Sequence, residues 1–149
     1  MKLTNKLTLL AGLVASSFAL NANAGIVTNA TDTLTGTGHA QLSEWLGEDV
    51  DLTRIFSKGV DGSTSQDWHA AVDNKGRSFT VMEIFNGDDR MIIGGYNSNS
   101  WSSSGPYYSG AKSFLFNLTK SNLYEKNSRY SNGRYATYNS GGYGATFGG

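Results

Sequence analysis

SFTVMEIFNGDDRMIIGGY, residues 78–96, is typical of two antiparallel strands joined by a tight turn. Phe79 and Val81 lie on one face of the first predicted strand, and Met82 and Ile84 lie on the other. Because both faces carry large apolar side chains, we expect an interior strand that is covered on both sides. The letters NGDD supply the turn between the two strands.

The rest of the chain divides into short elements. Thr64 is expected to cap a helix, with Asp67 completing a shortened capping box, and Gly76 is expected to end that helix. The remaining pattern predicts a short helix over 42–46, strands over 52–58 and 111–118, a loop over 97–110, and two or three short strands after residue 124. We therefore predict an α+β, mostly β fold: a two-sheet antiparallel β-sandwich with one or two short helices.

The N-terminus has the three parts of a secretory signal. Lys2 and Lys6 precede an apolar stretch over 7–20, and Ala22-Asn23-Ala24 forms a cleavage site. We expect residues 1–24 to be a signal peptide, 25–39 a linker or flexible arm, and 40–149 the folded domain. The apolar stretch is too short to span a bilayer, so no membrane span is expected after signal cleavage. We expect export to the periplasm, the cell surface or the medium.

Composition narrows the classes of partner. Removing 24 of the 149 residues leaves 125, enough for one domain, and the chain has no cysteine to form disulfides. The signal takes two lysines with it, leaving ten basic against twelve acidic residues and a net charge of −2. This near-neutral charge argues against nucleic acid as a partner, because phosphate binding requires clustered basic side chains.

Catalytic and metal-binding patterns are missing from the sequence. There is no nucleophile elbow, zinc motif, calcium loop or phosphate-binding glycine loop. His69 has Asp67 and Asp73 nearby in sequence, but residues two apart on a helix do not face each other. We expect His69 to be a hydrogen-bonding residue at the helix surface or half-buried. We predict no enzyme activity, no cofactor and no metal.

Aromatic residues in the 97–110 loop form a candidate binding loop. Tyr107 and Tyr108 stand among serine and glycine, a composition typical of recognition surfaces. Trp101 fits better as a plug at the end of the sandwich, although an exposed role stays open. Gly94-Gly95 indicates either a close backbone approach or a plain strand end.

Several spaced motifs resemble the TLDc domain, a family of β-sandwich modules. The resemblance covers about residues 40–149 and rests on Asp61-Gly62, Trp68-His69, the turn over 73–76, Gly94-Gly95-Tyr96, Trp101-Ser102 and the strand over 114–118. The chain resembles an exported, bacterial-type member. The family's domain continues past a Phe-Gly-Gly turn into further strands, so we expect residues 1–149 to be a fragment or a truncated product.

The resemblance implies a binding role, because the family has no established catalytic chemistry. Its eukaryotic members are associated with protection against oxidative stress and with binding the vacuolar proton pump. We therefore expect an exported, non-enzymatic interaction module whose partner is an unknown protein, with stress protection as a role implied only by the family. The alternative is a carbohydrate-binding or adhesin-like domain whose glycan partner binds the loop from Trp101 to Tyr108.

Overall fold

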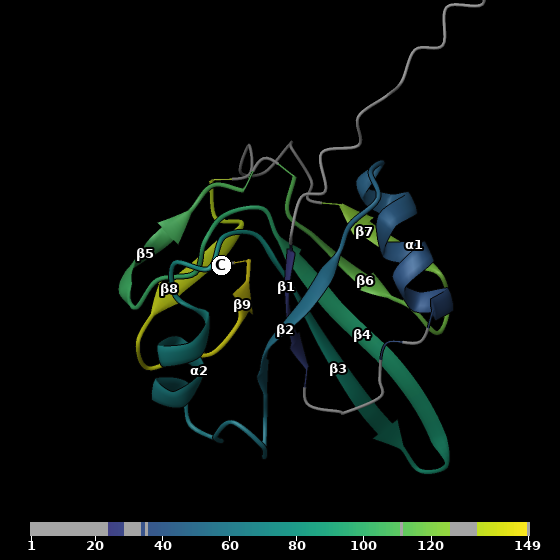
Figure 1. Cartoon of the computed structure of the whole chain (residues 1–149), viewed down its shortest axis with the longest axis horizontal. Coiled ribbons are helices and arrows are strands. Elements are labelled where there is room, and N and C mark those ends of the chain that lie inside the picture. The colour runs from purple at the N-terminus through teal and green to yellow at the C-terminus, as the bar shows by residue number, and fades with distance from the viewer. Residues whose placement is uncertain (1–23, 29–33, 35, 111, 126–133, 149) are drawn as a thin grey trace, which may run out of the picture.

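The computed structural model describes residues 24–28, 34, 36–110, 112–125 and 134–148. Its elements are β1 (Ala24–Thr28), α1 (Gly36–Leu46), β2 (Leu52–Ser57), α2 (Ser65–Val72), β3 (Ser78–Asn86), β4 (Asp89–Asn97), β5 (Ser104–Tyr108), β6 (Phe114–Asn117), β7 (Asn122–Glu125), β8 (Thr137–Ser140) and β9 (Thr146–Phe147). A large sheet has the order β2-β1-β3-β4-β6-β7, and a small sheet has the order β5-β8-β9 (Figure 1). The predicted mostly β fold with two sheets and two short helices is confirmed.

The hairpin predicted over 78–96 forms β3 and β4. These strands pair antiparallel from Ser78 opposite Asn97 to Asn86 opposite Asp89. The strands β4, β6 and β7 continue the sheet in the same antiparallel manner. The exception to the predicted antiparallel arrangement is β1, which runs parallel to β2 and to β3. Parallel pairing requires a crossover connection, and α1 lies in the connection from β1 to β2.

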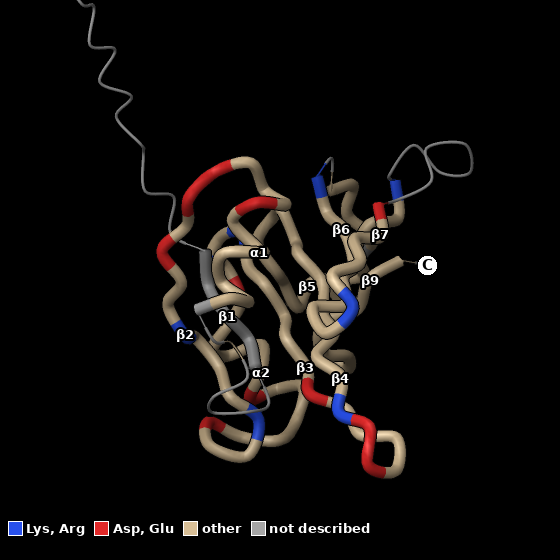
Figure 2. The backbone as a smooth tube through the Cα atoms, turned by 90° about the vertical axis from the view of Figure 1, so that its right-hand side faces the viewer, with Lys and Arg blue, Asp and Glu red and all other residues tan. Residues whose placement is uncertain are grey.

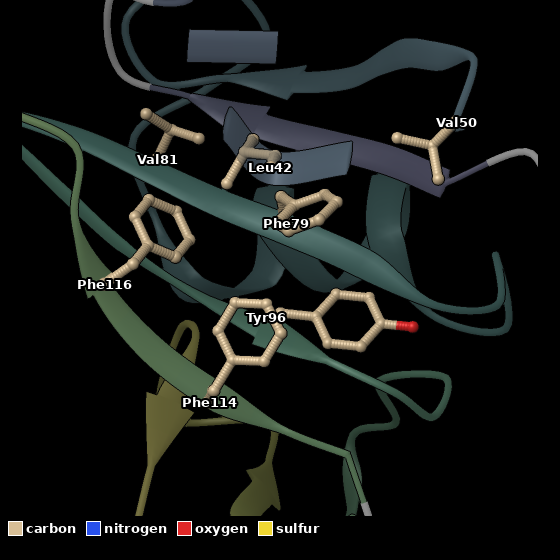
Figure 3. Packing of buried hydrophobic residues seen from close by; sticks show 7 residues of the cluster. All are labelled: Leu42, Val50, Phe79, Val81, Tyr96, Phe114 and Phe116. Atoms are coloured by element: carbon tan, nitrogen blue, oxygen red, sulfur yellow. The ribbon is translucent and has the colours of Figure 1, made fainter. Parts of the chain in front are cut away.

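One face of the large sheet, here called the inner face, carries the main core. Phe79 and Val81 of β3 point from it toward Leu42 of α1 (Figure 3). Tyr96 of β4 and Phe114 of β6 add rings that lie 4.9 Å and 6.4 Å from the Phe79 ring. Packing of this kind provides most of the stability of a domain that has no disulfide.

The opposite face, here called the outer face, carries a second core. Trp68 and Val72 of α2 pack there with Phe56 of β2 and with Trp101, which precedes β5. Phe147 of β9 packs against this cluster, so it ties the small sheet to the large one. The capping box predicted for α2 is confirmed, because Thr64 and Asp67 exchange hydrogen bonds at the start of the helix.

Two predicted segments differ from the structure. The expected linker over 25–39 contains most of β1 and the first residues of α1, and the expected loop over 97–110 contains β5. The segments AGIVT of β1 and SGPYY of β5 are only five residues long and show no clear alternation of apolar and polar residues, so they were not recognised as strands. The first turns of α1 contain two glycines, which disfavour a helix and hide its beginning. Residues 1–23 of the predicted signal peptide, 1–24, lie outside the described residues, and so do residues 126–133 of the segment expected to hold two or three short strands. Ala24, the expected last residue of the signal, is the first residue of β1.

The expectation that β3 is covered on both sides is wrong for its second half. Its residues are buried from Ser78 to Val81, but Met82 and Ile84 are 42% and 36% exposed. The small sheet has three strands against the six of the large sheet, so it covers only part of the outer face. None of the described helices is long and apolar enough to cross a membrane.

Candidate functional site

Asp61 and Gly62 build the turn that begins α2. The Asp61 carboxylate accepts a hydrogen bond of 2.7 Å from the Ser57 backbone N–H. Gly62 has a φ of 137°, and a side chain there would collide with Asp67. Asp67 accepts a hydrogen bond of 2.7 Å from the Thr64 hydroxyl, which is the main cause that lowers the pKa of the Asp67 carboxyl. These residues shape the helix start.

His69 is buried and joins α2 to the turn that follows β8. Its Nδ1 lies 2.7 Å from Asp73 Oδ1, and its Nε2 lies 3.0 Å and 2.9 Å from the carbonyl oxygens of Ser140 and Tyr143. The expected position at the helix surface or half-buried is wrong, because only 6% of His69 is exposed. Its partners 71 and 74 residues away could not be read from the sequence. Trp68 packs edge-on against the His69 ring at 4.7 Å.

Trp101 fills the space between the two sheets. It is fully buried, and its Nε1–H donates a hydrogen bond of 2.9 Å to the Ser78 hydroxyl. The Trp101 ring lies 5.1 Å from Trp68 and 5.4 Å from Phe147, edge-on in both cases. A ring so enclosed has no free face on which a ligand can stack.

Ser102 lies two residues before β5, and its backbone is hydrogen-bonded to Asn139, a residue that was not among the predicted site residues. Its backbone N–H donates a hydrogen bond of 3.1 Å to Oδ1 of Asn139, a fully buried side chain of β8. Asparagine among serine, glycine and tyrosine is typical of a turn. No local pattern therefore indicates that Asn139 is buried.

The pair Gly94-Gly95 lets aromatic rings approach the large sheet from both sides. A Cβ atom at Gly94 would lie 2.5 Å from the Phe116 ring on the inner face. A Cβ atom at Gly95 would lie 2.6 Å from the Phe147 ring on the outer face. Tyr96 follows within the inner core, and its burial raises the pKa of its hydroxyl. The two glycines thus mark a close approach of side chains to the backbone.

The predicted signature residues therefore lie mainly in turns and cores, and they do not converge on one open site. In the described ranges, no three His, Asp or Glu side chains gather closely enough to hold a metal ion together. The described residues line several surface hollows, and two of these, one polar and one mainly apolar, are candidates for a site.

The polar hollow lies beside the predicted binding loop. It has a volume of about 370 Å³ and is lined by Asn74, Asn99, Ser100, Trp101, Ser102, Tyr108 and Ser109. Tyr108 is 39% exposed, whereas Trp101 contributes only a buried ring. The lining is neutral and rich in hydroxyl and amide groups, which is chemistry suited to a small polar ligand.

Tyr107 belongs to a separate row of tyrosines. It is 42% exposed, and its ring lies 4.7 Å from Tyr138 and 5.1 Å from Tyr135. Because neighbouring residues of a strand point to opposite faces, Tyr107 and Tyr108 do not form one surface. The predicted binding loop is therefore divided between two faces of β5.

The mainly apolar hollow, here called the outer-face hollow, lies where the small sheet stops covering the large one. It has a volume of about 500 Å³ and is lined by Thr80, Met82, Ile93, Gly94, Gly95, Leu115, Phe116, Asn117, Tyr124, Ala145 and Phe147. None of these residues is charged. Figure 2 shows the charged residues of β4 and β7 toward the strand ends, and none on β6.

Large apolar side chains of the outer-face hollow remain open to solvent. Met82 of β3 is 42% exposed, Leu115 of β6 is 44% exposed and Tyr124 of β7 is 52% exposed. Met82 pairs with Ile93 across β3 and β4, and Leu115 pairs with Tyr124 across β6 and β7. The sequence of β3 indicated that Met82 belongs to an apolar face. It did not indicate that the small sheet leaves part of this face uncovered.

The Thr80 hydroxyl adds an unused polar group to this hollow. Thr80 is 6% exposed, and its Oγ1 has no hydrogen-bond partner among the described residues. Buried hydroxyls ordinarily have a partner, so an unpaired one beside a hollow is a position where a ligand atom can bind.

The motifs that resembled one family are matched by a comparison with family models. The model of the TLDc domain matches residues 28–149. Neither the curated proteins nor the solved structures contain a significant match to the chain. The fold, the spaced motifs and the matched range lead to one conclusion: the chain belongs to the TLDc domain family.

Proposed function

We propose that this TLDc domain is an exported, non-enzymatic interaction module that binds another protein through its outer face. The observation that carries the proposal is the outer-face hollow, where Met82, Leu115 and Tyr124 stay exposed beside a covered part of the same sheet. Contiguous apolar surface of this kind marks an interaction site on soluble domains. Its volume lies within the range of ligand-binding clefts.

A non-enzymatic role fits the positions of the titratable groups. The His69–Asp73 pair is the nearest approach to an acid–base pair in the predicted signature, and it is enclosed between α2 and the turn after β8. The His69 ring nitrogens contact Asp73 and the carbonyls of Ser140 and Tyr143. A side chain held in this way has a structural task, because a general base must reach the proton of a substrate.

Export and a role in stress are further parts of the proposal. The basic, apolar and small-residue segments of residues 1–24 support export, since they have the order of a secretory signal. Stress protection rests on the family alone. Deleting the gene and challenging cells with peroxide tests it, and growth equal to the parent strain would count against this part.

Partner capture tests the proposed function. The chain from Gly25 to Gly149 is immobilised and exposed to extracts of exported and cell-surface proteins. We expect a protein that is retained in a saturable manner and that is released by soluble chain. The absence of any saturable protein across these extracts would contradict the proposal.

Glycan binding is the second candidate, and the polar hollow is the observation that favours it. Tyr108 offers an exposed ring, and Asn99 and Ser109 add amide and hydroxyl groups beside it. Neutral sugars are bound by such a combination of stacking and hydrogen bonds. Trp101 cannot serve as the stacking ring because it is fully buried.

A glycan titration separates the two functions. If the polar hollow binds sugar, tryptophan fluorescence changes during the titration, since Trp101 lines the hollow. Tyr108→Ala should abolish that change, whereas Tyr107→Ala should leave it intact because Tyr107 packs on Tyr135 and Tyr138. A flat titration across a glycan panel would remove this candidate.

A further inference from the structure

We infer that His69 forms a proton-operated latch between α2 and the turn over 141–144, which follows β8. In the closed latch both ring nitrogens of His69 carry a proton, and the loss of one of these protons frees the turn. The latch is independent of the proposed binding role, and all of its parts are described residues.

The first argument is the kind of atom that faces the imidazole ring. Nδ1 lies 2.7 Å from a carboxyl oxygen of Asp73, and Nε2 lies 3.0 Å and 2.9 Å from the carbonyl oxygens of Ser140 and Tyr143. All three partner atoms accept hydrogen bonds, so both ring nitrogens must donate. A neutral imidazole has one N–H and one lone pair, whereas the imidazolium has two N–H groups. These contacts are therefore the contacts of an imidazolium.

The Asp73 carboxylate balances the charge of this cation. The proton between the two side chains belongs on the ring, because a histidine ordinarily holds its proton more tightly than an aspartate does. The ring is 6% exposed and the Asp73 side chain is 17% exposed. A charge so enclosed requires a partner of opposite sign, and Asp73 supplies it.

No other charged side chain among the described residues competes for the ring. Asp73 forms its described ion pair with His69. Asp67, the other carboxylate of α2, accepts its hydrogen bonds at the helix start, including one from the Thr64 hydroxyl. Lys58, which follows β2, is exposed, and β2 itself contributes apolar side chains to this core. The turn after β8 contributes backbone carbonyls.

The turn is the part of the latch that can move. Three of its four residues are glycines, and a Cβ atom at Gly142 or Gly144 would meet nothing within 4 Å. The turn is closed by a hydrogen bond of 2.9 Å from the Tyr143 N–H to the Ser140 carbonyl. The ring of Tyr143 is 57% exposed, so it anchors the turn weakly. The two bonds from His69 Nε2 therefore hold a segment that has few contacts of its own.

The other end of the latch is fixed. The Asp73 N–H donates a hydrogen bond of 3.0 Å to the His69 carbonyl at the end of α2. Asp73 also forms a backbone bridge with Trp101, and the Asn74 N–H donates a hydrogen bond of 3.1 Å to the Trp101 carbonyl. When the ring loses a proton, a lone pair faces either Asp73 or the two carbonyls, and a buried acceptor is left without a donor. Because Asp73 is anchored, we expect the turn to move away.

This loss of a proton makes the latch sensitive to pH. In an unfolded chain a histidine ordinarily loses its second proton at about pH 6.5. The closed latch keeps that proton at higher pH, so at about pH 8 the folded chain holds about one proton more than the unfolded chain. Stability therefore falls as the pH rises, and the equilibrium constant of unfolding should increase about tenfold per pH unit. The latch is closed near neutral pH and opens in alkaline solution.

Asp73→Asn is the matched variant that tests the latch. The asparagine amide can donate to Nδ1 of a neutral ring, whose Nε2–H still donates to the two carbonyls. Other titrating groups are the same in both proteins, and the extra proton is no longer needed. Between about pH 7 and about pH 9, the unfolding constant in urea should rise about tenfold or more beyond the rise seen in Asp73→Asn. An equal rise in both proteins would overturn the inference.

Nitrogen-15 NMR of the histidine rings detects the protons without any variant. Both nitrogens of His69 should give the signals of an imidazolium at about pH 8. His39 is the internal comparison: among the described residues its contact is from Nε2 to the Val50 carbonyl at 2.5 Å, so one N–H is enough. A neutral His69 ring at this pH would overturn the inference, whatever the unfolding data show.

Acrylamide quenching of tryptophan fluorescence separates opening of the turn from a general loss of stability. Trp68 is 5% exposed, its ring lies 4.7 Å from the His69 ring, and it lines a small hollow together with Gly144 of the turn. Without denaturant, quenching at about pH 9 should be about twofold stronger than at about pH 7 in the wild type and unchanged in Asp73→Asn. Quenching that does not change with pH in the wild type, or that rises equally in both proteins, would show that no latch opens.

Discussion

Replacing Gly95 with alanine should destabilise the fold by pushing β9 off the large sheet. The added Cβ would lie 2.6 Å to 2.8 Å from three atoms of the Phe147 ring. Carbon atoms in contact prefer about 3.5–4.0 Å, so the ring must retreat by about 1 Å. Overpacking of this size costs about 1–3 kcal/mol.

A smaller gain opposes this cost. Alanine restricts the unfolded chain and thereby stabilises the folded state by about 0.4–1 kcal/mol where the backbone conformation suits it. Gly95 is absent from the residues with positive φ, so the gain applies. We therefore expect Gly95→Ala to lower the free energy of unfolding by about 1–2 kcal/mol.

A double-mutant cycle isolates the clash. In the Phe147→Ala background the ring is gone, so Gly95→Ala should be neutral or slightly stabilising. The coupling energy between the two positions should then be about 2 kcal/mol. Urea unfolding measures it, with tryptophan fluorescence as the signal because Trp101 lies 5.4 Å from Phe147. An equal cost of Gly95→Ala in both backgrounds would refute the predicted contact.

Three further changes test other contacts. Trp101→Phe removes the donor to the buried Ser78 hydroxyl and should cost about 1–3 kcal/mol in urea unfolding; adding Ser78→Ala should recover part of it, and an unchanged midpoint in Trp101→Phe would contradict this bond. His69→Phe leaves buried acceptors unpaired and should lower the thermal midpoint more than His69→Gln does, whereas equal midpoints would argue against the hydrogen bonds. The pKa of Asp67 lies below its ordinary 3.8, so this carboxylate stabilises the fold above that pH, and the stabilisation is lost as the pH falls through the folded pKa. The acid limb of the thermal midpoint should be less steep in Asp67→Asn, and an identical limb would contradict the cap.

Local sequence signals predicted the elements that contain them. The capping box from Thr64 to Asp67 and the hairpin of residues 78–96 depend on neighbours in the chain, and both are present in the structure. The strand β1 has no such local signal, because it pairs with β2 and β3, which are distant from it in the sequence. It was therefore not predicted. A short strand between parallel neighbours leaves little trace in its own residues.

The candidate site was harder to predict than the fold. The alternation of Met82 and Ile84 indicated a second apolar face on β3, but not that the small sheet stops short of it. His69 was predicted to be at least half-exposed, because nothing in the neighbouring sequence indicates that the carbonyl groups of Ser140 and Tyr143 pack against it. Exposure of a face depends on what packs over it, and that is a property of the whole fold.

One binding measurement tests most directly whether the outer face binds the partner. The protein captured by the wild-type chain is titrated against the wild type and against Leu115→Lys, with Val60→Lys and Tyr108→Ala as controls. We expect Leu115→Lys to bind about 100-fold more weakly, which corresponds to about 2.7 kcal/mol, while both controls bind like the wild type. Equal affinity of Leu115→Lys and the wild type would contradict binding at the outer-face hollow.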